Sequence, residues 1–150
     1  MRRKLVLSLL ALSFVSITVL AQAAKPAAAP SLYKRLGGYD AIAAVTDDFV
    51  PRLVADKQVG RFLVGLSDSS KNRLRQNFID LVCQATGGPC VYVGRDMKTS
   101  HKGLGISGSD WDQSVKLLVE TLDKLKVPQK EKDDLLALVT TLKADIVEKP

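Results

Sequence analysis

Apolar residues recur every three or four positions along several stretches of this 150-residue chain. The two clearest stretches contain Leu74, Phe78, Leu81, Val82 and Ala85, and then Trp111, Val115, Leu118, Val119, Leu122 and Leu125. This spacing places the apolar side chains on one face of a helix, and no stretch alternates as a half-buried strand does. The sequence therefore predicts an all-α fold with about five or six helices of unequal length.

Helix breakers and caps set the expected boundaries. The glycines at residues 37–38 precede a helix in which Pro51 should cause a kink or an early end, unless its missing N–H is not needed. The polar residues 67–70 can cap the next helix, which Gly-Gly-Pro at residues 87–89 should stop.

Two further helices are expected in the last third of the chain. Ser107 and Asp110 resemble a capping pair at the start of the first one. Pro128 is expected in the first turn of the second, whose apolar residues continue to Ile146.

The N-terminus has the three parts of an export signal. Basic residues at positions 2–4 are followed by an apolar run over residues 5–20 and by Ala-Gln-Ala at residues 21–23. A retained signal anchor is the alternative, but the apolar run is short for a membrane span, which needs about 20 residues. We therefore expect a periplasmic or secreted protein with no stable membrane insertion after cleavage.

The chain then divides into three parts. Residues 1–23 are expected to be a cleaved signal peptide, and residues 24–30 form an Ala/Pro-rich flexible lead with nothing to bury. Residues 31–150 have the length of one domain, and they contain no internal repeat.

The charge balance gives no support for a nucleic-acid partner. The whole chain has 22 Lys and Arg against 16 Asp and Glu, a net charge of +6. Cleavage after residue 23 removes three basic residues and no acidic one, which leaves 19 against 16 and a net charge of +3. The remaining charges are interleaved, as at residues 130–134, which is typical of a solvated helix face.

Two cysteines, Cys83 and Cys90, lie on either side of a Gly-Gly-Pro turn. In an oxidising compartment they could form a disulfide across this turn. They could equally be two small buried apolar residues, because spacing alone does not report geometry.

His101 is the only histidine in the chain. A closed zinc site would need three or four protein ligands, whereas an iron porphyrin already carries four nitrogens and needs only one imidazole. A short helix around this residue would place Met97, four residues earlier, on the same face. The single imidazole therefore favours a porphyrin ligand over structural zinc.

Several motifs occur together in a fixed order. They are Leu-Tyr-Lys-Arg-Leu-Gly-Gly at residues 32–38, Asp-Asp-Phe at 47–49, Gln-Ala-Thr-Gly-Gly-Pro at 84–89, Tyr-Val-Gly-Arg-Asp-Met-Lys-Thr-Ser-His at 92–101 and Val-Pro at 127–128. In these motifs the chain resembles the truncated haemoglobins of group I. The resemblance covers residues 31–147.

This resemblance implies a two-over-two helical sandwich around haem b (iron protoporphyrin), with His101 as the protein ligand of the iron. Met97 and Tyr92 should then lie against the porphyrin on the proximal or propionate side. The expected pocket walls are Phe49, Phe62, Leu118, Leu136 and Val139. Each of these residues is equally compatible with an ordinary core.

The chain departs from the family pattern on the distal side of the expected haem. Many group I members have a tyrosine after the helix phenylalanine, assisted by glutamine, whereas this chain has Val50 there. Leu74 and Phe78 occupy the two distal-helix positions, and Leu63 follows Phe62 where a second phenylalanine is usual. The resemblance therefore predicts an apolar distal pocket, unless Gln76 or Asn77 reaches it.

An apolar pocket has consequences for ligand binding. Bound dioxygen carries partial negative charge, and a buried hydrogen bond to a charged acceptor contributes about 1.5–3 kcal/mol. Without a donor, oxygen should leave about ten-fold faster or more, and discrimination should shift toward nitric oxide and carbon monoxide.

Four functions remain open from the sequence. The first is an exported globin that reversibly binds a diatomic gas ligand. The second is a nitric oxide dioxygenase with an unknown reductant, and the third is a haem redox or electron-transfer protein. The fourth is a haem-free helical module with a structural or partner-binding role.

Overall fold

The computed structural model describes residues 29–149 and contains seven α-helices and one 3-10 helix in this range. The helices are α1 (Leu32–Arg35), α2 (Gly38–Ala55), η1 (Gly60–Phe62), α3 (Asp68–Ala85), α4 (Met97–His101), α5 (Gly108–Lys124), α6 (Gln129–Thr140) and α7 (Lys143–Ile146). Within this range the β pairing is one isolated bridge between Ser107 and Lys149, so the all-α prediction is confirmed. The predicted signal peptide, residues 1–23, and residues 24–28 of the predicted lead lie outside the described residues.

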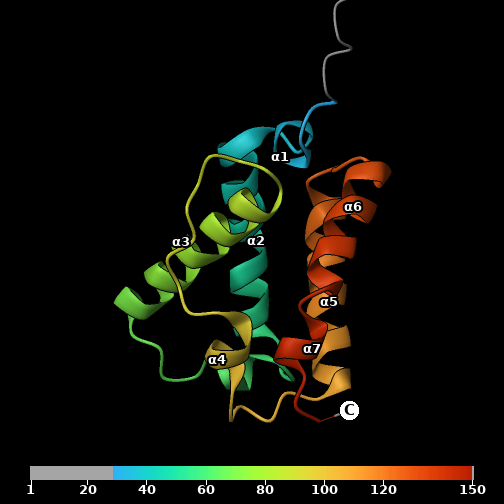
Figure 1. The fold of residues 1–150 in the computed structure, drawn as a ribbon. Helices are drawn as coiled ribbons and strands as arrows, with labels where there is room; N and C mark the ends of the chain where they lie inside the picture. Colours follow the sequence, from blue (N-terminus) through green and yellow to red (C-terminus); the bar gives the residue numbers. More distant parts are fainter. Residues whose placement is uncertain (1–28, 150) are drawn as a thin grey trace, which may run out of the picture.

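The long helices form two pairs. Helix α2 packs against α3 on one side and against α5 on the other, and α5 also contacts α6 (Figure 1). The short helices α4 and α7 lie together near one end of this arrangement (Figure 1). The main core lies where the elements meet and consists of Phe49, Leu53, Val59, Leu117, Leu118, Leu122 and Leu135.

Helix α2 does not end at Pro51 but continues to Ala55. A proline inside a helix leaves the carbonyl four residues earlier, here that of Asp47, without its donor. Both Pro51 and Asp47 are exposed, so water can satisfy this carbonyl. The burial of Phe49 and Leu53 on the other face then stabilises the helix enough for it to continue past Pro51.

The last predicted helix is interrupted before Ile146, because α6 ends at Thr140 and α7 begins at Lys143. Two threonine side chains lie at the break. The Thr140 hydroxyl donates to the carbonyl of Leu136 at 2.7 Å, and the Thr141 hydroxyl donates to that of Leu138 at 2.6 Å. Such bonds compete with the backbone ladder and favour a change of helix direction.

The carboxylate of Asp48 joins α2 to α5. It accepts hydrogen bonds from Arg52 at 2.5 Å, from Thr121 at 3.1 Å and from Lys124. The Lys124 and Arg52 bonds lower the pKa of Asp48 from 3.8 to about 2. Because the pKa is lowered in the folded state, the stability that Asp48 contributes is present above about pH 4 and is lost between about pH 4 and pH 2.

We therefore expect the Asp48→Asn variant to unfold more easily than the wild type at neutral pH, with the difference shrinking from pH 4 to pH 2. Urea unfolding followed by circular dichroism at pH 6, 4, 3 and 2 measures this. Lys124→Met keeps the carboxylate but removes one partner, so its stability should be intermediate at neutral pH. A difference between the wild type and Asp48→Asn that stays constant over the whole range contradicts the assignment.

Candidate functional site

A large cavity of about 1310 Å³ lies between the helix pairs. It exceeds the volume of about 300–1,000 Å³ that is typical of small-molecule sites. Helices α2, α3, α4, α5 and α6 all contribute to its walls, which are mostly apolar. The rings of Phe49 and Phe78 meet edge to face at a centroid distance of 5.8 Å, and both line the cavity.

The structure brings most of the sequence-predicted site residues to this cavity. The residues that line it are His101, Met97, Tyr92, Phe49, Phe62, Leu63, Leu74, Phe78, Leu118 and Val139. Val50 and Leu136 are not among the lining residues. Val50 is buried within α2, and Leu136 packs against the main core.

The cavity-lining residues of α2 and α6 form helical rows that include the residues directly before Val50 and Leu136. On α2 the row runs through Thr46, Phe49 and Leu53, and on α6 it runs through Leu135 and Val139. The period of three and four contained the signal for Leu53 and Leu135. It does not exclude Val50, four residues after Thr46, or Leu136, three residues before Val139, so the period alone could not separate lining from non-lining positions.

The His101 imidazole has a defined orientation. Its Nδ1 lies 2.7 Å from the carbonyl oxygen of Met97, four residues earlier. A carbonyl can only accept, so Nδ1 carries the hydrogen and donates it. In the neutral ring Nε2 then holds the free lone pair, which leaves it available as a metal ligand on a residue that lines the cavity.

Helix α4, which carries His101, has only five residues. A helix of this length is not stable alone, so contacts at its ends must hold it. At its N-terminus the Asp96 carboxylate accepts from the backbone N–H of Thr99 at 2.7 Å and from its hydroxyl at 2.8 Å. These bonds lower the pKa of Asp96, so the cap is strongest when this group is ionised.

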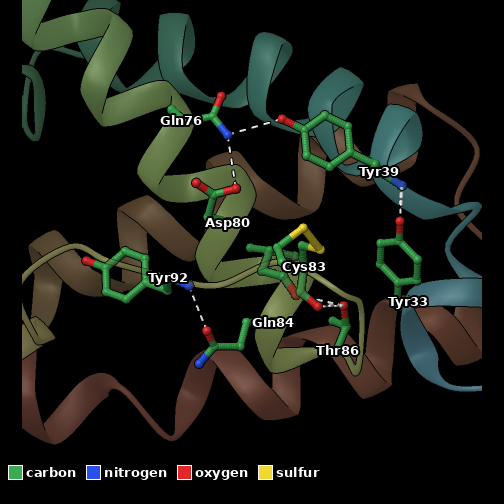
Figure 2. The surroundings of a disulfide bond; sticks show 10 residues. Tyr33, Tyr39, Gln76, Asp80, Cys83, Gln84, Thr86 and Tyr92 are labelled. Atoms are coloured by element: carbon green, nitrogen blue, oxygen red, sulfur yellow. Dashed lines mark hydrogen bonds between the residues drawn. A yellow bond between two sulfur atoms is a disulfide. The ribbon is translucent and has the colours of Figure 1, made fainter.

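The segment before α4 is fixed by Tyr92. Its backbone N–H donates to the side-chain oxygen of Gln84 at 2.7 Å (Figure 2), and its hydroxyl donates to the carbonyl of Arg95 at 2.7 Å. The ring packs so closely on Gly94 that a Cβ there would lie 2.4 Å from the ring. Burial raises the pKa of the Tyr92 hydroxyl, which keeps it a donor at neutral pH.

A disulfide joins Cys83 of α3 to Cys90 in the loop that follows (Figure 2). The sequence left this pairing open. The chain turns at Gly87, whose φ is +82°. At Gly88 the backbone then lies close to the Cys83 sulfur. A Cβ on Gly88 would lie 2.6 Å from the Cys83 sulfur and 2.5 Å from the Tyr33 ring, so this position needs glycine.

The structure separates the two neighbouring amides Gln76 and Asn77. Gln76 is exposed and donates to the hydroxyl of Tyr39 at 3.1 Å and to Asp80 at 3.0 Å (Figure 2). Asn77 lines the cavity. Of the two, only Asn77 is placed to offer a side-chain donor there.

The charged residues along the cavity wall are mainly basic. Arg73, Arg95 and Lys126 line it, and none of the ion pairs within residues 29–149 includes them. Asp110 is the acidic residue among the lining residues, and Arg61 pairs with it at 2.9 Å. The wall therefore offers uncompensated positive charge to an anionic group of a ligand.

Asp110 has a structural role at the start of α5. Its carboxylate accepts from the Ser107 hydroxyl at 2.7 Å, from the Ser107 backbone N–H at 2.9 Å and from Gln58 at 3.1 Å. The Ser107 bonds form the predicted cap of α5 and lower the pKa of Asp110 far below its usual value. The group therefore stays ionised and tied to its partners.

Comparison with known proteins gives the family. The profile described as bacterial-like globin matches residues 31–148. The group 1 truncated hemoglobin GlbN of Mycolicibacterium paratuberculosis is 31% identical over 116 residues, which cover 77% of this chain and 83% of that protein. The protein of the same name from Synechocystis sp. is 32% identical and covers 75% of this chain and 88% of its own length. This chain belongs to the group 1 truncated haemoglobins.

Solved structures agree with this fold. The 2/2 hemoglobin of Synechococcus sp., determined with covalently attached heme, superposes with a TM-score of 0.72 at 28% identity and covers 80% of this chain and all of its own. The truncated hemoglobin of Tetrahymena pyriformis gives a TM-score of 0.73 at 24% identity, with the same coverage of both chains. The two helix pairs of this truncated haemoglobin thus form the predicted two-over-two sandwich. Among residues 29–149 no helix combines the length and apolar character that crossing a bilayer requires.

The disulfide should contribute to the stability of this truncated haemoglobin. The bridge spans seven residues of sequence. The loop-entropy relation then gives about 2.5 kcal/mol of stabilisation through restriction of the unfolded chain. We expect the Cys83→Ala/Cys90→Ala double variant to lose about this free energy of unfolding in urea titrations.

A reductant provides the control. Dithiothreitol should lower the stability of the wild type to near that of the double variant and should leave the double variant unchanged. Equal unfolding free energies for the oxidised wild type and the double variant contradict a stabilising bridge.

Proposed function

We propose that this protein is an exported globin that binds haem b through Nε2 of His101 and reversibly binds a diatomic gas ligand. The observation that carries the proposal is the hydrogen bond from Nδ1 to the Met97 carbonyl, which leaves Nε2 as the free nitrogen on a residue of the cavity wall. Membership of the truncated haemoglobins supports the same cofactor.

The residues present fit haem. The cavity is large and mostly apolar, as a flat macrocycle requires, and one imidazole suffices because the ring supplies four nitrogens. The basic side chains of Arg73, Arg95 and Lys126 suit its two propionate carboxylates. Bound there, haem would supply the iron centre for a diatomic ligand, while Met97, Tyr92 and the apolar walls exclude water from it.

Export is the second part of the proposal. The N-terminal residues 1–23 have the pattern of a signal peptide. The disulfide between Cys83 and Cys90 supports an oxidising compartment, because such bonds persist mainly outside the cytoplasm. We propose the periplasm or the exterior of the cell as the location.

Replacement of His101 tests the cofactor ligand. Absorption spectra of the ferric, ferrous and carbonmonoxy forms should show a displaced Soret band and weak haem retention in His101→Ala compared with the wild type. In a His101→Gly variant, added imidazole should restore the wild-type spectrum. An alanine variant with an unchanged Soret band contradicts ligation by His101. A wild-type protein that is colourless and does not bind added haemin favours a haem-free helical module.

The remaining part of the proposal is a distal wall that gives the bound ligand no side-chain hydrogen bond, although Asn77 lies at the cavity. Leu74 and Phe78 line the cavity on α3, and Asn77 is the amide on the same wall. If the bound ligand has no side-chain donor, Asn77→Leu should change the oxygen dissociation rate by less than about two-fold. Stopped-flow measurement on the ferrous protein tests this, and Gln76→Leu is the matched control because Gln76 contacts Tyr39 and Asp80.

The oxygen dissociation rate, the nitrate yield and the resting spectrum together separate the alternative functions. A ten-fold faster oxygen dissociation in Asn77→Leu identifies Asn77 as a donor and contradicts an apolar pocket. Nitric oxide dioxygenase activity needs slow loss of oxygen from the iron, and the nitrate yield measures this activity. Rapid loss without nitrate removes this enzyme function. A redox carrier would show a six-coordinate resting spectrum, yet Met97 lies on the same short helix as His101.

A further inference from the structure

The C-terminal residues hold the loop that leaves the His101 helix. The carboxylate of Glu148 accepts hydrogen bonds from the backbone N–H of Gly103 at 2.7 Å and from that of Gly105 at 2.6 Å. Gly103 and Gly105 have φ values of +84° and +65°, a conformation that suits glycine. This loop thus presents two backbone donors to one carboxylate, as in backbone sites that bind anions.

Backbone bonds next to Glu148 add to this contact. The N–H groups of Glu148 and Lys149 both donate to the carbonyl of Ile106, at 2.9 and 3.1 Å. The N–H of Gly108 donates to the carbonyl of Lys149 at 3.0 Å. Helix α7, which leads into these residues, also packs against α4. Residues 147–149 therefore act as a C-terminal strap across the loop at residues 102–107 and the first residue of α5.

The strap lies at the end of α4 that lacks a side-chain cap. Asp96 caps the N-terminal end, whereas the loop contacts of Glu148 begin two residues after His101. Glu148 is not among the residues that line the cavity, so it can influence the site only through the backbone. The two N–H bonds also lower the pKa of Glu148, which keeps the carboxylate ionised at neutral pH.

We propose that Glu148 is a positioning residue for His101, which fixes the end of α4 and thereby the direction of the imidazole. This inference rests on the proposed binding of haem by His101. It assigns to the C-terminal strap a role in haem retention and in the geometry of the bond between imidazole and iron. Loss of the strap would let α4 fray from its C-terminal end.

The haem-loaded full-length mature protein provides the test, with Glu148→Ala and Glu148→Gln as variants. Transfer of haem to an excess of a high-affinity apoglobin should be at least about ten-fold faster in Glu148→Ala, because the variant loses two hydrogen bonds to a charged acceptor and the loss of one accounts for about that factor. The iron–histidine stretching band in the resonance Raman spectrum of the ferrous protein should shift or broaden. Glu148→Gln keeps one acceptor oxygen, so its rate should be intermediate, and it serves as the test if the alanine variant fails to fold.

Two controls separate positioning from general destabilisation. Asp145→Asn removes an exposed negative charge from α7, and both readouts should match the wild type. Asp48→Asn weakens the contact between α2 and α5 far from α4 in sequence, so it should leave the iron–histidine band unchanged. A band shift in Asp48→Asn equal to that in Glu148→Ala overturns the positioning role.

The failure of this inference is distinct from failure of the proposed function. If the wild type holds haem and His101→Ala does not, while Glu148→Ala matches the wild type in both readouts, only the role of Glu148 is overturned. If the wild type holds no haem, the proposed function is overturned and the role of Glu148 with it.

Discussion

The orientation of the His101 imidazole depends on one hydrogen bond, which Nδ1 donates to the carbonyl of Met97 within the same short helix. That bond fixes the tautomer and the ring direction only while the helix exists. A single turn does not persist in water, so the site depends on whatever holds this turn in place. In this protein the holding groups are Asp96 before the helix and the packing of α7 and the C-terminal strap after it.

The long helices follow from the sequence because burial of one apolar face outweighs local irregularities. Pro51 shows this: it removes one backbone bond on an exposed face, and the buried Phe49 and Leu53 still keep α2 intact. The break between α6 and α7 was harder to predict, since it involves the hydroxyls of Thr140 and Thr141 and not the apolar pattern. A periodic pattern reports which face is buried but not where a polar side chain competes with the backbone.

Most of the residues predicted as haem-pocket residues lie at the cavity, and two do not. His101, Tyr92, Leu74 and Phe78 all line the cavity, whereas Val50 and Leu136 do not. The helical period does not separate these cases, because Val50 lies four residues after Thr46 and Leu136 three residues before Val139. The disulfide could not be decided from the sequence for a related reason. Its geometry depends on where α3 ends and on the turn at Gly87, which spacing alone does not fix.

The rotation of α3 sets the chemical character of the cavity wall. Ile79 and Cys83 are fully buried against Ile42 of α2, which fixes the face that α3 turns toward its neighbour. With those residues held, Phe78 and Asn77 must face the cavity, while Gln76 must face Tyr39. The bridge from Cys83 to Cys90 then ties this same rotation to the loop that leads to His101. Packing between α2 and α3 therefore selects which amide reaches the cavity, and the disulfide links that choice to the segment that precedes α4.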